Sequence, residues 1–122
     1  MIAEDFEIYL RGLGVAVEVI TGQDDQRYSM VHDVELTKGA LRDRRCDIAI
    51  LRVETVPYVP PAAIHTRPHL VPMDSNEPLK TMASGIGPQW QYWSRRFDRP
   101  PTPKALWTHI LTVLGDDRWP TP

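Results

Sequence analysis

The sequence predicts an α+β domain: a helix opens the chain, a four-stranded antiparallel meander follows, and a long irregular loop leads to a closing helix. Three observations support this class. Apolar residues recur at helical spacing near both ends of the chain, alternating segments rich in β-branched residues lie between them, and polar turns join those segments. A chain of 122 residues is expected to form a single domain over residues 1–122.

The opening helix is expected over residues 3–11. Its inward-facing residues at helical spacing are Phe6, Leu10 and Leu13, and Gly12 ends the pattern. The first ten residues are acidic and amphipathic, so we do not expect a secretory signal.

Three segments have the composition of strands. Residues 15–21 alternate and are rich in β-branched side chains. Residues 28–36 place alternate side chains on one face: Tyr28, Met30, His32, Val34 and Leu36. Residues 46–54 form the most apolar run, which is typical of a central strand.

Prolines end this meander. Pro57, Pro60 and Pro61 cannot donate to a strand ladder and hold their predecessors extended, so residues 56–61 should leave the sheet as a rigid segment. Residues 62–66 are expected to return briefly to the sheet as its fourth strand.

The second half of the chain is expected to hold a loop and a helix. Residues 72–89 are polar and turn-rich, and a loop of this length usually has a function. The closing helix should begin at Pro103, with Thr102 as its N-cap, and end at Gly115. Its apolar stripe consists of Leu106, Ile110 and Leu114, with Trp107 and Leu111 beside it.

Charge and composition argue against several classes of function. A net charge of −2 gives no electrostatic attraction for nucleic acid or for an anionic membrane. No apolar run approaches the ~18–20 residues that a membrane helix needs. The single cysteine, Cys46, excludes an internal disulfide framework and fits a reducing, cytoplasmic setting.

Two motifs stand within this order of elements. A proline pair follows the third expected strand in Val56-Pro57-Tyr58-Val59-Pro60-Pro61, and an aromatic segment follows the loop in Gln89-Trp90-Gln91-Tyr92-Trp93-Ser94-Arg95-Arg96. Together with the preceding helix and meander, this proline motif resembles the corresponding part of the ubiquitin-conjugating (E2, UBC) fold. The tyrosine that precedes the motif in the family is absent here. The aromatic segment is similar to the tryptophan–serine signature of bacterial E2-like families encoded beside ubiquitin-like conjugation genes. The resemblance spans roughly residues 3–114.

The resemblance implies a chemistry and a set of partners. In the family, a histidine–proline–asparagine step leads from the fourth strand to a cysteine on the long loop. That cysteine accepts the C-terminus of a ubiquitin-like protein from an E1 enzyme as a thioester and passes it to an amine. We expect no cofactor.

The sequence departs from the family at the catalytic position. Arg67-Pro68-His69-Leu70 stands where the histidine step should be, without an asparagine, and residues 70–96 contain no cysteine. The one thiol, Cys46, falls at the start of the third expected strand, where a free cysteine is usually a small buried hydrophobe. A thioester on Cys46 remains an alternative.

Two serines lie on the loop where the family's cysteine would stand. Ser75 or Ser84 could form an oxyester, with His69 or His65 as the only nearby candidate base. We expect no metal site, because Pro68 prevents a regular helix from presenting both histidines and no third ligand lies nearby.

The aromatic segment allows two interpretations. Trp90, Tyr92 and Trp93 most simply pack the long loop against the closing helix. Alternatively, they form an exposed patch that contacts a partner, with Arg95 and Arg96 at its polar rim.

We therefore expect an E2-like pseudoenzyme that serves as a binding or scaffolding subunit. Its expected partners are an E1-like enzyme and a ubiquitin-like protein of a bacterial conjugation operon. Two alternatives stay open. One is an active noncanonical ubiquitin-like protein transferase that carries the modifier on Cys46, Ser75 or Ser84. The other is a structural adaptor unrelated to ubiquitin-like chemistry.

Overall fold

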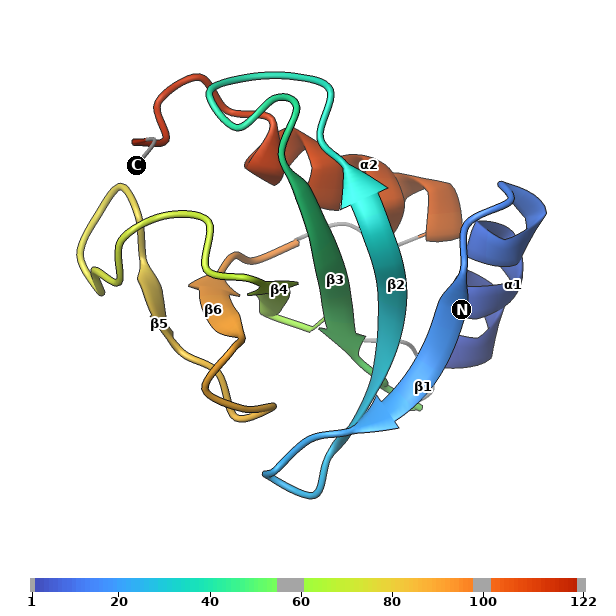
Figure 1. Cartoon of the computed structure of the whole chain (residues 1–122). Helices are drawn as coiled ribbons and strands as arrows, with labels where there is room; N and C mark the ends of the chain where they lie inside the picture. Colours follow the sequence, from blue (N-terminus) through green and yellow to red (C-terminus); the bar gives the residue numbers. More distant parts are fainter. Residues whose placement is uncertain (1, 55–60, 98–101, 121–122) are drawn as a thin grey trace.

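The computed structural model describes residues 2–54, 61–97 and 102–120 (Figure 1). Within these ranges the elements in chain order are α1 (Ala3–Gly12), β1 (Val17–Thr21), β2 (Arg27–Glu35), β3 (Arg45–Leu51), β4 (Ala63–Arg67), β5 (Thr81–Ala83), β6 (Gln91–Ser94) and α2 (Pro103–Leu114). The strands form one antiparallel sheet in the order β1-β2-β3-β4-β6-β5. The α+β class and both terminal helices are confirmed, whereas the finer UBC-like assignment stays a prediction.

The predicted number of four strands is wrong. The sheet has six, because β5 lies within the segment that was expected to be irregular and β6 lies within the aromatic segment. β6 pairs with β4 on one side and with β5 on the other, so it extends the meander beyond its fourth strand. Strands of three and four residues are too short for their alternation to stand out in a sequence.

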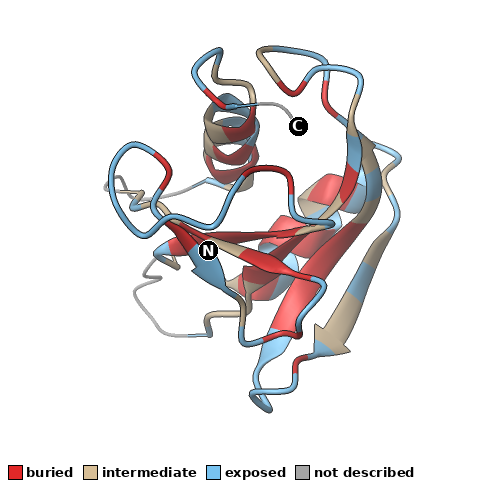
Figure 2. Ribbon diagram, turned by 60° about the vertical axis from the view of Figure 1, so that its left-hand side comes forward, coloured by how far each residue is buried: buried red, intermediate tan, exposed pale blue. Residues whose placement is uncertain are grey.

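The main core lies between the two helices and one face of the sheet (Figure 2). Phe6 of α1 and Trp107 of α2 contact each other there, with ring centroids 6.5 Å apart. The predicted stripe of α2 is buried, as the periodicity requires: Leu106, Ile110 and Leu114 are at most 2% exposed. Leu13 was expected on the inward face of α1, but it is the C-cap residue and is 51% exposed.

One charged side chain enters this core. Glu7 of α1 is buried, and it accepts hydrogen bonds from the Arg52 Nε (2.8 Å) and from the hydroxyl of Ser29 on β2. Burial works against the charged form of Glu7, but these donors outweigh it and hold the pKa of the carboxyl below its ordinary value. The ion pair therefore attaches the opening helix to the sheet.

A β-bulge changes which way β2 faces. Residues 28–36 were expected to place alternate side chains on one face, but the register of β2 against β3 shifts between Val31 and Val34. Asp33 has a positive φ of 51°, and its amide donates to the Asp47 carboxylate (2.9 Å). The extra residue reverses the alternation, so Tyr28 and Val34 join different clusters.

The opposite face of the sheet carries a second, smaller cluster. Its buried members are Tyr28, Met30, Ala49, Ile86 and Trp90. The last two come from the segment between β5 and β6, which lies over this face. Part of the predicted functional loop is therefore a cover for the sheet.

The boundaries of α2 follow from its capping residues. Thr102 accepts a hydrogen bond from the Ala105 amide (3.1 Å), and Pro103 occupies the first turn, as predicted. Of the proline motif, Pro57 and Pro60 lie outside the described residues, and Pro61 precedes β4. In the part of the chain that the structure describes, no helix has the length and apolarity needed to cross a membrane.

Candidate functional site

The only thiol of the chain lies in the core. Cys46 is on β3, 3% exposed, and packs in the main cluster beneath the helices. Burial, and then the negative charge of Asp47, raise the pKa of its thiol to about 12. A thioester requires an accessible thiolate, so the structure gives Cys46 neither the exposure nor the ionisation that this chemistry needs.

One predicted serine does meet a histidine. The Ser84 Oγ lies 2.8 Å from the His65 Nδ1, a contact that joins the end of β5 to the middle of β4. Of the two candidate bases, His65 is therefore the one that reaches this serine. The same Oγ accepts a hydrogen bond from the Ile86 amide (3.1 Å), which closes a tight turn.

Aromatic rings enclose His65. It is 4% exposed and lies edge-on between Tyr28 and Tyr92, with ring centroids 5.1 and 5.3 Å away. Burial lowers the pKa of His65 to about 4, and the nearby Asp24 offsets only part of that effect. A neutral imidazole can accept the serine proton, but a base so weak contributes far less to catalysis than one whose pKa lies near neutrality.

The β1–β2 turn fixes the segment around Ser84. Asp24 accepts a hydrogen bond from the Tyr28 hydroxyl (2.5 Å), and its amide donates to the Gly85 carbonyl (3.0 Å). A Cβ on Gly85 would lie 2.6 Å from an oxygen of the Asp24 carboxylate, so a larger residue there would require the Asp24 side chain to shift. The contact of Ser84 with His65 thus joins the covering segment to the sheet.

The other two candidates from the loop lie apart. Ser75 is exposed in the turn before β5. The His69 Nε2 faces two carbonyl oxygens, those of Pro88 and Trp90, each at 3.1 Å, so it must be the protonated donor nitrogen. No group of three potential metal-ligating side chains occurs within residues 2–54, 61–97 and 102–120.

The aromatic segment is largely structural. Trp93 is fully buried in the main core and Trp90 is 4% exposed in the second cluster, so neither indole can contact a partner in this structure. Trp93 on β6 faces the main core, whereas Trp90, which directly precedes β6, lies on the opposite face of the sheet. Tyr92, Arg95 and Arg96 keep solvent-accessible surface, and a role for them in partner binding stays a prediction.

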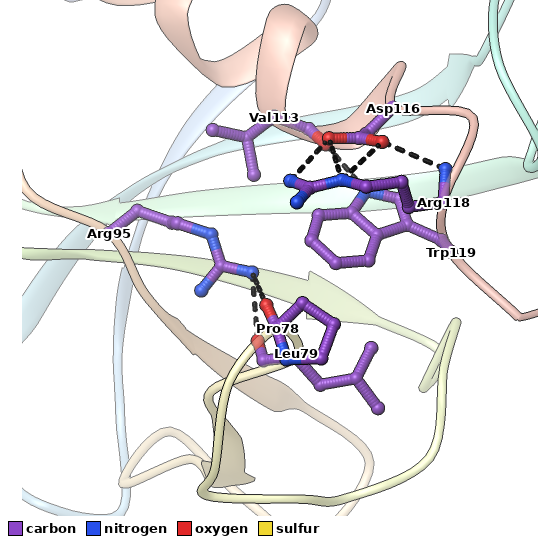
Figure 3. A network of polar contacts seen from close by, with 7 residues as sticks. All are labelled: Pro78, Leu79, Arg95, Val113, Asp116, Arg118 and Trp119. Atoms are coloured by element: carbon purple, nitrogen blue, oxygen red, sulfur yellow. Dashed lines mark hydrogen bonds and ion pairs between the residues drawn. The ribbon is translucent and has the colours of Figure 1, made fainter.

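Arg95 is held in place just after β6 (Figure 3). Its Nη1 donates to the Ser94 carbonyl (2.6 Å), and its Nη2 donates to the carbonyls of Leu79 (2.8 Å) and Pro78 (3.3 Å). Its Cζ lies 5.2 Å from the ring centroid of Trp119. The guanidinium is therefore fixed by carbonyl oxygens and an aromatic face.

The tail after α2 completes this arrangement. Trp119 is 4% exposed; its Nε1 donates to the Val113 carbonyl (2.6 Å), and its ring meets Trp93 edge-on at 5.5 Å. Arg118 lies 5.5 Å from the same indole and forms an ion pair with Asp116 (2.8 Å). The indole is thus flanked by two guanidiniums.

The role of this tail was not predicted from the sequence. Asp116, Arg118 and Trp119 follow the expected helix end at Gly115, where the chain is polar apart from one tryptophan. That isolated tryptophan was the available signal, because an apolar residue just beyond a helix often folds back onto its last turn.

Comparisons of the chain with models of protein families, with curated proteins and with solved structures find no match.

Proposed function

We propose that this chain is a non-catalytic, E2-like binding subunit of a bacterial ubiquitin-like conjugation system in the cytoplasm. Its partners in this proposal are an E1-like enzyme and a ubiquitin-like protein. One observation carries the non-catalytic part: the only cysteine, Cys46, is buried in β3 with a pKa raised to about 12. A chain that cannot present a thiolate cannot perform ordinary transthiolation.

The order of elements supports the E2-like part of the proposal. A helix precedes a meander of β1 to β4, a proline motif precedes β4, and α2 packs on the sheet. The segment between β4 and β6 occupies the place of the family's catalytic loop, and here it carries hydrogen bonds and apolar contacts that bind it to the sheet.

Surface residues of the aromatic segment provide the first test of binding. Arg96 is exposed beside β6, so Arg96→Glu reverses a charge at the predicted partner surface. We expect about tenfold weaker binding to the E1-like enzyme or ubiquitin-like protein encoded by neighbouring genes, measured by calorimetry. Arg42→Glu, at an exposed position in the β2–β3 connection, is the matched control.

Two results would contradict the binding proposal. One is that neither purified partner binds the wild-type chain. The other is that both variants weaken binding equally, which would indicate an effect of net charge alone.

A second candidate function rests on the contact between Ser84 and His65. At 2.8 Å, a hydroxyl and an imidazole have the geometry of a nucleophile and a base, which favours an oxyester-forming transferase. Against it stands the burial of the histidine, which lowers its pKa to about 4. An adduct that survives hydroxylamine at neutral pH, is cleaved by hydroxide and is lost in Ser84→Ala would establish this function.

A further inference from the structure

A cavity of about 360 Å³ lies where the end of β6, the last turn of α2 and the tail after it meet. Figure 3 shows Arg95 below and the pair formed by Asp116 and Arg118 above, with Trp119 between them. Lys80, at the start of β5, contributes to the same wall. Two of its residues, Arg95 and Arg96, also belong to the predicted partner surface, and none takes part in the covalent chemistry considered above.

Carbonyl oxygens, and no carboxylate of the described residues, accept the hydrogen bonds of Arg95. Within the described ranges it donates three of these bonds, and it takes part in no ion pair. A guanidinium has five N–H groups, so two remain for a ligand. The carbonyls and the Trp119 ring hold the side chain in one orientation, so little entropy is lost when it binds.

The lining carries an excess of positive charge. Four cationic side chains, Lys80, Arg95, Arg96 and Arg118, face two carboxylates, Glu77 and Asp116. Both carboxylates are already paired, with Lys80 (2.7 Å) and Arg118 (2.8 Å) respectively. The local charge is thus opposite in sign to the net charge of −2 of the whole chain.

Like charges face each other across the indole. Burial lowers the pKa of Arg95, and Arg118 lowers it further while Glu77 and Asp116 act in the opposite direction. An anion in the cavity beside Arg95 would offset the positive charge of the lining and replace the solvation that Arg95 loses on burial.

We propose that this cavity binds an oxyanion group, a carboxylate or a phosphate, carried by a peptide segment of a protein partner. The size of the cavity fits one such group with its neighbouring atoms. Nucleic acid is disfavoured as the ligand, because it is bound along a row of cations and this chain is acidic overall. The inference does not depend on the E2-like assignment.

NMR titration tests this directly. The probes are acetyl-triglycine with a free carboxylate, its C-terminal amide, acetyl-phosphoserine amide, and a single-stranded oligonucleotide. We expect the first or third probe to shift the Arg95 Nε–H and Trp119 Nε1–H signals, and we expect the amide to have no effect. The stronger of the two binders identifies whether the partner supplies a carboxylate or a phosphate.

Variants link the binding to the cavity. Arg95→Gln should weaken binding at least about tenfold, whereas Arg45→Gln, an exposed arginine paired with Asp33 on the opposite part of the sheet, should change it less than about twofold. If Arg95→Gln does not fold, Arg118→Gln tests the proposal in its place. This variant leaves Asp116 without its ion-pair partner at the cavity, so anion binding should weaken several-fold.

Four results would overturn the proposal. They are no binding of either anionic peptide at millimolar concentration, equal binding of the amide, unchanged affinity in the folded arginine variants, and tighter binding of the oligonucleotide than of both peptides.

Discussion

Acidification should destabilise this protein before its carboxylates titrate, because of His65. The side chain is 4% exposed, and burial lowers its pKa from the ordinary 6.5 to about 4. The unfolded chain therefore takes up a proton in the pH range where the folded chain does not. The stabilisation is complete above pH 6.5 and is lost as the pH falls through the folded pKa of about 4.

The magnitude follows from the two pKa values of His65. The difference between a pKa of 6.5 in the unfolded chain and about 4 in the folded chain corresponds to about 3 kcal/mol of the free energy of unfolding once the titration is complete. Between pH 7.5 and pH 5, linkage gives a loss of about 2 kcal/mol. Urea unfolding followed by tryptophan fluorescence measures it, since Trp93 and Trp119 are buried.

Two variants isolate the contribution of this side chain. His65→Gln removes the titrating group, so its free energy of unfolding should fall about 2 kcal/mol less than that of the wild type over the same range. Cys46→Ala also changes a buried side chain but removes no group that titrates there, so it should keep the wild-type slope. Equal pH dependence in the wild type and His65→Gln would refute the reasoning.

Three further predictions concern other side chains. Glu7→Gln removes the carboxylate that Arg52 and Ser29 surround, and it should cost about 3 kcal/mol in urea unfolding; a loss below about 1 kcal/mol would contradict the buried ion pair. Ser84→Ala should cost about 1 kcal/mol and accelerate hydrogen exchange of the Ile86 amide, and unchanged exchange would contradict its role in the turn. The Cys46 thiol should react with Ellman's reagent only as fast as the protein opens, so rapid labelling of the native chain would contradict its burial.

Much of the fold follows from local patterns in the sequence. The helical spacing of Phe6 and Leu10 and the capping pair Thr102 and Pro103 predict both helices, because caps and apolar stripes are properties of consecutive residues. β6 could not be predicted in this way. Its four residues become a strand because β4 and β5 pair with it on both sides.

The candidate functional residues show the same difference between local patterns, which the sequence reveals, and tertiary contacts, which it does not. Both tryptophans of the aromatic segment are buried, but only Trp93 lies in the core with residues of α2. Trp90 packs on the opposite face of the sheet, so the expected packing against the closing helix is wrong for Trp90. The contact of Ser84 with His65 was one of several possible pairings, because only the sheet register brings β4 and the end of β5 together. The cavity at Arg95 depends on Trp119 folding back onto α2; the isolated tryptophan hints at this contact, but its position in the sequence does not indicate that Arg95 and Trp93 lie against it.

The central claim is that this chain binds its partners without forming a covalent bond to the modifier. Mass spectrometry of one mixture tests it most directly: the chain, the E1-like enzyme, the ubiquitin-like protein and ATP, measured under native and then denaturing conditions. We expect a complex in the native spectrum and only the unmodified chain after denaturation. A denatured species with the combined mass of the chain and the ubiquitin-like protein, less one water, would contradict the claim.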